Sequence, residues 1–518
     1  MLPTVGADDS ASPWAVLLAQ PGLARAALLT LWTGCAATVL SSATAVLLAL
    51  ACVRPGVARL ARAALPPALA TPHAALAIGL AFLISPSGWL ARLASPWLTG
   101  WRYPPDIATV GDPWGLALIA GLWLKEAPFL LLVLLAALGQ AQPEAGMRAA
   151  AGLGYGPARG WALAVLPRAW AQVRLPVLAV LAFSCSAVDV ALVLGPSEPP
   201  TLAVLALRLL TDADLRRWPI GSAAALLLVA VAVAGVVILL ALEVAVSRAG
   251  LAVLRRGGRG GAGRGVQAVA VVLGALLAIL VAAGLVALLL WSLAGAWRFP
   301  AALPAPWSLR PWQAQAGLLA APALTTAVLG LAAAALAVLL AVAWVEEGRR
   351  RGEKPGRAPA LAYAPLLVPQ IAFLAGWQGV LIALRLDGGF AGLLWSHLVY
   401  ALPYAMLTLV EPWRALDPRY ARAAACLGAS PWRVLLRVVL PLLARPVLAA
   451  GAVAFAVSAG LYLPTLFAGA GRWTTLTTEA LALASGADRR VLGATALAQA
   501  ALPLAAFALA ILWPDRRA

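Results

Sequence analysis

The chain has 518 residues, of which 63% are hydrophobic and only 11% are charged. A soluble protein of this length needs far more polar surface to cover its core, so the composition excludes a water-soluble domain and indicates a chain embedded in a bilayer. The formal net charge of +18 does not predict nucleic-acid binding, because arginine is the residue expected in the cytoplasmic loops of a membrane protein.

Eleven apolar segments are long enough to cross about 30 Å of hydrocarbon as helices. They cover residues 24–52, 64–84, 115–138, 174–195, 220–246, 267–292, 315–345, 361–385, 392–411, 447–468 and 491–513. In the first 22 residues no basic stretch precedes an apolar one, so we expect no signal peptide there. Asp8, Asp9, Pro13 and Pro21 also interrupt what would be a twelfth span. The sequence therefore predicts an all-α polytopic membrane protein.

Arginines set the orientation of these spans. Segment 53–63 contains three arginines and segment 247–266 contains five, and neither contains an acidic residue. With eleven spans, both segments lie on the same side of the membrane as the loops 139–173 and 412–446. The positive-inside rule makes that side cytoplasmic and the N-terminus external. Arg489 and Arg490 fit less well, because they would lie outside.

A Gly/Arg-rich run at 255–265 separates two stretches of similar length. Its composition is typical of a flexible, solvated linker, and a contact with lipid headgroups is the alternative. We therefore expect an N-terminal half at 1–246 with about five spans, a cytoplasmic linker at 247–266, and a C-terminal half at 267–518 with about six.

The two halves contain an internal repeat. Residues 148–167 and 422–441, which are 274 residues apart, are identical at eleven of twenty positions, whereas chance would give about two. Each copy falls in a cytoplasmic loop and has a run of alanines, a glycine and a final Leu-Pro. The glycine permits a turn without a steric penalty, so each loop is predicted to form a short helix–turn–helix at the membrane surface.

These loops, at 143–168 and 417–442, resemble the EAA loops of type I ABC importer permeases. Two copies in one chain are similar to the fused permeases of the ferric iron and thiamine branch. The resemblance implies a parallel repeat of two halves and docking of both loops on a separate ATPase, which we expect to be a homodimer. One departure is that arginine stands where the family pattern has glutamate. The implied coupling residues are Arg148, Ala149, Ala150, Gly154, Leu166, Pro167, Arg422, Ala423, Ala424, Gly428, Leu440 and Pro441.

Ionisable residues within the spans are candidates for the solute path, because a charge at membrane depth is costly. Lys125 and Glu126 lie in the third span, where they contact solute or a gate, or form an interhelical ion pair. Asp189 lies near the outer end of the fourth span, either lining the entrance or reaching the interface. The candidate path residues are Lys125, Glu126, Pro128, Asp189, Tyr400, Pro403 and Tyr462.

The segment 469–483 is expected outside the membrane. By the resemblance it would meet a periplasmic or lipoprotein solute-binding protein through Arg472, Thr474, Thr475 and Glu479. The alternative is a solvated loop in which Thr475 caps the next helix.

The sequence contains no phosphate-binding loop of the form GxxxxGK[ST], so ATP hydrolysis is expected in a separate subunit. Its two histidines and four cysteines are scattered, and no metal site, disulfide framework or cofactor is predicted. The leading hypothesis is an inner-membrane importer permease that moves a small solute by alternating access. An ion-coupled secondary transporter with duplicated halves is the alternative.

Overall fold

The computed structural model describes residues 12–52, 54–140, 143–259, 263–351, 358–486 and 488–512. Within this part of the chain there is no strand, and an isolated β-bridge joins Ala294 to Trp307. Nine helices of the described residues are long and apolar enough to cross a membrane. A tenth span is added if the pair Pro431–Leu442 and Ala444–Gly460, bent by 79°, is counted as one. The predicted all-α polytopic fold is confirmed.

Up to residue 255 the chain forms twelve α-helices, a π-helix and a 3-10 helix within the described residues. They are α1 (Pro13–Leu18), α2 (Leu23–Ala51), α3 (Pro55–Ala70), α4 (His73–Ile84), α5 (Trp89–Ala94), α6 (Leu116–Gln140), α7 (Pro143–Gly152), α8 (Pro157–Gly160), the π-helix η1 (Trp161–Val165), α9 (Leu166–Ser186), α10 (Val188–Leu194), α11 (Leu202–Leu210), the 3-10 helix η2 (Leu215–Arg217) and α12 (Trp218–Arg255).

The remaining helices repeat much of this order. They are α13 (Gly263–Ser292), α14 (Arg310–Arg351), α15 (Ala358–Leu367), α16 (Gln370–Ala383), α17 (Phe390–Ala415), α18 (Pro418–Cys426), α19 (Pro431–Val434), the π-helix η3 (Leu435–Val439), α20 (Leu440–Leu442), α21 (Ala444–Gly460), α22 (Leu463–Gly469), α23 (Leu476–Ala484) and α24 (Arg489–Leu512).

The prediction of eleven continuous spans is wrong at four of them. The segment 64–84 is interrupted before Pro72 and 361–385 before Pro369, because the residue before a proline is driven out of the helical conformation. The segments 174–195 and 447–468 are interrupted at Ala187 and at Leu461, whose backbones are extended. The spans of the described chain are therefore partly built from broken helices.

The structure also shortens the predicted linker. Helix α12 continues to Arg255 and α13 begins at Gly263, so only residues 256–259 of the described part of 247–266 are not helical. Residues 260–262 of the predicted linker, and the residues before 12 where a twelfth span was considered, lie outside the described part of the chain.

Each half is organised around three long helices that pack on one another. In the N-terminal half these are α2, α6 and α9, and in the C-terminal half α14, α17 and α21 take the same places in the order. Helix α13 does not follow this division, because it packs on α2 and α4 as well as on α24. Its Gly284 lies so close to Gly79 of α4 that a Cβ on Gly79 would meet the Gly284 carbonyl oxygen at 2.8 Å.

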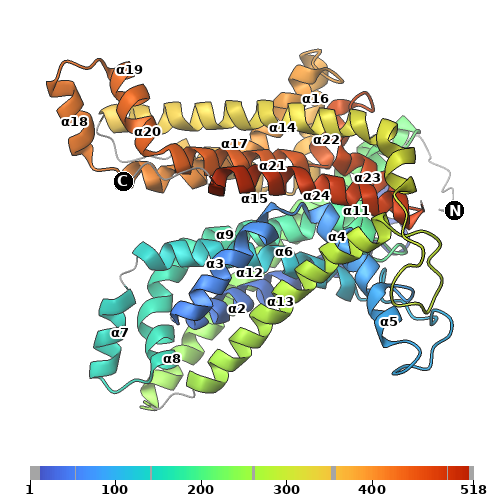
Figure 1. Cartoon of the computed structure of the whole chain (residues 1–518), viewed down its shortest axis with the longest axis horizontal. Coiled ribbons are helices and arrows are strands. Elements are labelled where there is room, and N and C mark those ends of the chain that lie inside the picture. Colours follow the sequence, from blue (N-terminus) through green and yellow to red (C-terminus); the bar gives the residue numbers. More distant parts are fainter. Residues whose placement is uncertain are drawn as a thin grey trace.

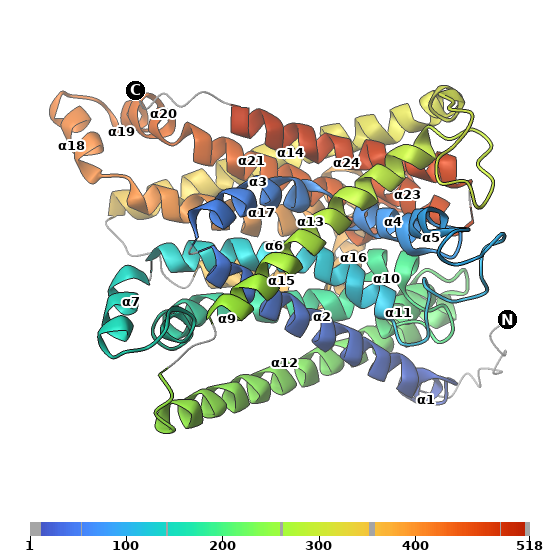
Figure 2. The ribbon, with the colours of Figure 1, turned by 60° about the horizontal axis from the view of Figure 1, so that its bottom comes forward.

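The helices run largely along the long axis of the molecule, so that the two ends are distinct (Figure 1). The short helices α7 and α8 and the short helices α18 to α20 lie at one end, where they project from the N-terminal and C-terminal halves respectively. Helices α1, α5, α11 and α23 lie towards the other end, as the rotated view also shows (Figure 2). The end that carries α7, α8 and α18 to α20 is the one that the arginine distribution predicts to be cytoplasmic.

Candidate functional site

The first repeated loop turns on a glycine. Helix α7 ends in a Schellman motif in which Gly154 has a φ of 81°. The Gly154 amide donates to the Ala151 carbonyl at 2.9 Å, and the Tyr155 amide donates to the Ala150 carbonyl at 3.0 Å. Helix α8 and the π-helix η1 follow and lead into α9, which begins at Leu166. The chain thus forms the predicted helix–turn–helix.

The second loop repeats this geometry 274 residues later. Gly428 has a φ of 79°, and its amide donates to the Ala425 carbonyl at 2.9 Å. The Ala429 amide donates to the Ala424 carbonyl at 3.1 Å. The π-helix η3 begins at Leu435, which is the position equivalent to Trp161, where η1 begins. The sequence repeat is therefore also a repeat of backbone conformation and of hydrogen bonds.

We call the segments 143–160 and 417–434 the first and second tips. The side chains of Arg148, Ala149, Arg422 and Ala423 are exposed on them, and Gly154 and Gly428 are exposed at their turns. Ala150 is buried, because it packs against Gly160, where a Cβ would come within 2.9 Å of the Ala150 Cβ. At the ends of the repeats, Leu166 and Leu440 are half-buried whereas Pro167 and Pro441 are exposed, and Ala424 is half-buried.

Sequence reasoning missed one leucine at the apex of each tip. Leu153 is 63% exposed and Leu427 is 88% exposed, and each immediately precedes the turn glycine. Both are large apolar side chains that are exposed at equivalent places of the repeat. The signal was present in the sequence, since the Leu-Gly pair is conserved between the two copies of the repeat.

The tips rest on different supports. The first tip contacts the connection between α12 and α13: the Gly156 amide donates to the Arg259 carbonyl at 3.1 Å, and Arg159 Nη1 donates to the Gly258 carbonyl at 2.5 Å. The second tip contacts the end of α14, where Arg350 lies 5.7 Å from the ring of Trp432.

Glu346 holds this second support in place. Its side chain is only 3% exposed, and it accepts hydrogen bonds from Arg349 Nη2 at 2.6 Å and from Arg350 Nε at 2.9 Å. A carboxylate buried this far needs both arginines, because an uncompensated charge there would be costly. The pair of ion pairs therefore fixes the direction in which Arg350 reaches the second tip.

The two adjacent ionisable residues of the third predicted span have separate partners. Lys125 is buried, and its Nζ donates to the carbonyls of Ala68, Leu69 and Thr71 at 3.2, 2.7 and 2.6 Å. These carbonyls end α3, where a cation compensates both the unsatisfied acceptors and the helix dipole. In this structure Lys125 is therefore used to close the break between α3 and α4.

Glu126 pairs instead with a histidine that was not among the predicted path residues. His73, the first residue of α4, places Nε2 3.1 Å from Glu126 Oε1, and its ring lies 4.7 Å from the ring of Phe183. Asp189 interacts electrostatically with both His73 and Glu126. A histidine beside a proline break inside an apolar run was the available sequence signal.

Tyrosines from the C-terminal half approach the same carboxylates. Tyr404 of α17 interacts electrostatically with Glu126, and Tyr462, just before α22, interacts with Asp189. We call His73, Glu126, Asp189, Tyr404 and Tyr462 the polar cluster. Three of its members come from α4, α6 and α10, and its two tyrosines come from the later part of the chain; His73 and Glu126 are in direct contact, whereas the other interactions within the cluster are electrostatic.

The other predicted path residues lie in the helix packing. Tyr400 is 4% exposed and packs edge-on against Phe373, with ring centroids 6.1 Å apart. Pro128 and Pro403 are buried inside α6 and α17. In the described residues there is no group of three or more His, Cys, Asp or Glu that could hold a metal ion.

At the outer end, Thr475 is the N-cap of α23 and forms a capping box with Thr478. This is the structural role that the sequence left open for it. Arg472 and Thr474 are exposed just before this cap, and Glu479 is half-buried in the first turn of α23. The predicted binding-protein residues therefore lie together at the end opposite the tips (Figure 1).

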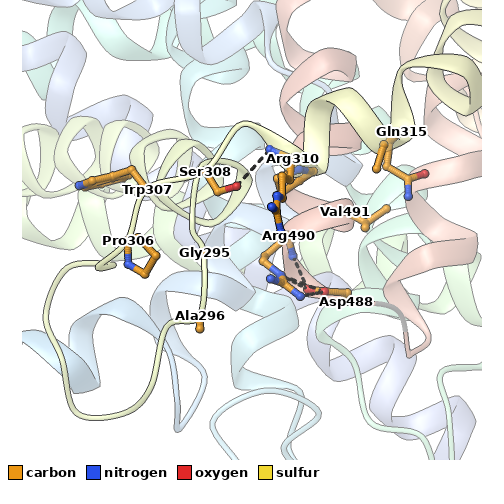
Figure 3. Close-up of a pocket in the computed structure, with 12 residues that line it drawn as sticks. Gly295, Ala296, Pro306, Trp307, Ser308, Arg310, Gln315, Asp488, Arg490 and Val491 are labelled. Carbon is orange, nitrogen blue, oxygen red and sulfur yellow. Dashed lines mark hydrogen bonds and ion pairs between the residues drawn. The ribbon is translucent and has the colours of Figure 1, made fainter.

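A cavity of about 450 Å³ lies at this end, between the connection of α13 to α14 and the start of α24. Arg310 and Arg490 both line it, and Gln315 lies on the α14 side (Figure 3). Arg490 Nε donates to Asp488 Oδ2 at 2.9 Å, and this hydrogen bond holds the pKa of the Asp488 carboxyl below its ordinary value. None of the residues that line this cavity belongs to the polar cluster.

The fold and these features define a class of protein: a polytopic helical membrane protein with two repeated tips at one end. Comparison with known proteins agrees. Residues 358–514 match the family described as binding-protein-dependent transport system inner membrane component. The chain is 33% identical to the inner membrane ABC transporter permease protein YnjC of Escherichia coli K12 over 513 residues, which cover 97% of this chain and 90% of that protein.

The chain thus belongs to the inner-membrane permeases of binding-protein-dependent ABC transport systems, and it is a multi-pass inner-membrane protein. Shorter matches include the spermidine/putrescine transport system permease protein PotC. It is 32% identical over 91 residues in E. coli K12 and 26% identical over 98 residues in Haemophilus influenzae Rd, covering 34% and 38% of those proteins. A permease of this class works with an ATPase and a solute-binding protein.

Proposed function

We propose that this chain supplies both transmembrane halves of the importer. The N-terminal half is 1–246, the C-terminal half is 267–518, and 247–266 joins them on the cytoplasmic side. The observation that carries the proposal is the pair of tips, which repeat the same backbone hydrogen bonds at the same end of one chain. A permease that formed only one half would need one such tip.

Each tip docks in a cleft of an ATPase subunit, and the two subunits form a homodimer. Two identical clefts suit this chain, because both tips present an arginine, a run of alanines and a Leu-Gly pair at equivalent positions. Closure of the dimer on ATP moves the tips, and the motion reaches the spanning helices through η1 into α9 and through η3 into α21. The halves then alternate between outward and inward access. Exposed Leu153 and Leu427 are the apolar contacts of this docking.

The solute passes the polar cluster and carries positive charge. The cluster contains two carboxylates, Glu126 and Asp189, whereas the neighbouring Lys125 is occupied by three backbone carbonyls. A cationic solute agrees with the branch to which the sequence bears a resemblance, that of ferric iron and thiamine, and with the polyamine systems named for PotC. On the outer face, Arg472, Thr474 and Glu479 contact the solute-binding protein.

Purification of the tagged chain from native membranes in mild detergent tests this function. Mass spectrometry of the purified complex should find an ATPase with a phosphate-binding loop, at two copies per chain. A chain that is recovered intact and without any ATPase overturns the proposal.

A glycine variant tests the coupling itself. Gly428→Val places a branched side chain at a φ of 79°, which costs at least about 1–2 kcal/mol locally, although no neighbour lies within 4 Å of the new Cβ. It should lose solute uptake and ATPase retention while keeping its thermal stability within a few degrees. Gly250→Val in α12, where a Cβ also meets nothing within 4 Å, is the matched control and should keep all three. Unchanged uptake in Gly428→Val would count against coupling through the tips.

A further inference from the structure

Each tip carries an exposed arginine at the same position, five residues before the apical leucine. Arg148 and Arg422 form no ion pair or side-chain hydrogen bond with any residue that the structure describes. We propose that the two ATPase clefts that receive the tips are acidic, and that each presents carboxylates to Arg148 or Arg422. This inference rests on the proposed function, because it specifies the chemistry of the partner that the tips meet.

The charge of the tips is one-sided. Residues 143–168 contain one acid and three arginines, and residues 417–442 contain one acid and four arginines. Asp417 pairs with the exposed Arg419, whose Nε lies 4.0 Å from Asp417 Oδ2, but neither acid forms an ion pair with Arg148 or Arg422. Glu144 lies one turn before Arg148 without forming an ion pair to it, and Asp417 Oδ1 accepts from the Arg419 amide at 2.9 Å as the N-cap of α18.

The arginines lie next to apolar side chains that a partner would cover. Leu153 is 63% exposed and Leu427 is 88% exposed, so burial of each in a cleft would remove a large apolar surface from water. An arginine at the edge of such a contact loses part of its hydration, and a carboxylate in the partner compensates for that loss. A cleft lined with basic residues would instead repel both tips.

A lipid surface fits these arginines less well than a protein does. In both views, α7 and α18 extend beyond the spanning helices of their own halves (Figures 1 and 2). The residues near the apex of each tip are thereby carried beyond the ends of the spanning helices. A protein that covers the end of the molecule reaches Arg148 and Arg422 together with the two leucines.

Binding of the ATPase that co-purifies with the wild-type chain tests the proposal. The purified ATPase is titrated onto the detergent-solubilised permease at 0.05 and 0.5 M NaCl. The double variant Arg148→Glu with Arg422→Glu should bind at least tenfold more weakly than wild type at low salt. The double replacement by lysine should stay within threefold of wild type, and wild-type binding should weaken at high salt because exposed charges are screened.

The matched control changes the net charge by the same amount elsewhere. Arg54 and Arg248 are exposed arginines of the cytoplasmic side that lie outside the tips. The double variant Arg54→Glu with Arg248→Glu should bind the ATPase like wild type. Equal weakening of this control would show a bulk charge effect and overturn the proposal.

The remaining outcomes are also decisive. If wild type recovers an ATPase and the glutamate variant of the tips binds it as tightly, the acidic cleft is wrong while the proposed function stands. If that variant binds ATPase normally but loses bound phosphatidylglycerol, the arginines serve the lipid and the proposal fails. If wild type recovers no ATPase, the proposed function itself fails. If the proposal is right, replacement of the ATPase carboxylate residue that faces the tip by arginine should restore binding of the ATPase to the glutamate variant.

Discussion

Replacement of Lys125 by methionine isolates the role of its three hydrogen bonds. Methionine has a similar length and suits an apolar helix, so the packing of α6 is largely kept. The carbonyls of Ala68, Leu69 and Thr71 lose their common donor at distances of 2.6 to 3.2 Å. An unsatisfied buried acceptor costs about 1–3 kcal/mol, and removal of one member of a buried polar set costs about 3–5 kcal/mol in total. We therefore expect a loss of about 3–5 kcal/mol.

This loss should appear as a lower Tm of the purified protein in detergent, by about 5 °C or more. Lys125→Arg keeps the charge and the donors and should recover part of the stability. Glu126→Gln leaves the three Lys125 hydrogen bonds in place and should lower the Tm by less than half as much. If Lys125→Met melts within 1 °C of wild type, the three carbonyls do not depend on the ammonium and the reasoning is wrong.

Three further predictions concern other parts of the structure. Glu346→Gln should destabilise the protein by about 2–4 kcal/mol, because Arg349 and Arg350 lose a buried charged partner. The control Glu347→Gln removes an exposed ion pair and should cost less than about 0.5 kcal/mol. Thermal unfolding of the two variants measures the difference. In a variant without the native cysteines, Tyr462→Cys should react at least fivefold faster with a cationic than with an anionic methanethiosulfonate reagent. Addition of Asp189→Asn should abolish that preference. Equal rates with the two reagents, whether residue 189 is Asp or Asn, would contradict a cationic path. Asp112 accepts from three amides at the start of α6, so Asp112→Ala should cost about 1–2 kcal/mol, again read as a lower Tm.

The helix–turn–helix of each tip was predictable because local chemistry determines it. An alanine run followed by glycine favours a helix that ends in a left-handed residue, and both copies form the same Schellman hydrogen bonds. The apical leucines were visible in the sequence as well, but their exposure was not. Whether an apolar residue is buried depends on which elements pack over it, and periodicity over a segment this short does not determine that.

The polar cluster was predictable only in part. Glu126 and Asp189 could be found because an acid within an apolar span is expensive. His73 could not be paired with Glu126 from sequence, since 53 residues separate them and the pairing depends on the break between α3 and α4. The same break explains why Lys125 is not a free cation in the path. A continuous helix over 64–84 would have offered it no carbonyls.

The two tips are alike, whereas the segments that they contact in the rest of the chain differ. The tips share the Leu-Gly pair at the turn and the same backbone hydrogen bonds, as the proposed docking in two identical clefts would demand. Their supports do not agree: the α12–α13 connection holds the first tip, whereas Arg350 and buried Glu346 hold the second. The segment that a tip contacts limits how far that tip can move before the spanning helices move with it. Equal movements of the two subunits of an ATPase dimer should therefore displace the two halves of the permease by different amounts. The polar cluster is unequal in the same sense, since its carboxylates come from one half and its tyrosines from the other. A solute held between them would be released when one half moves first, which a symmetric pair of supports would not provide.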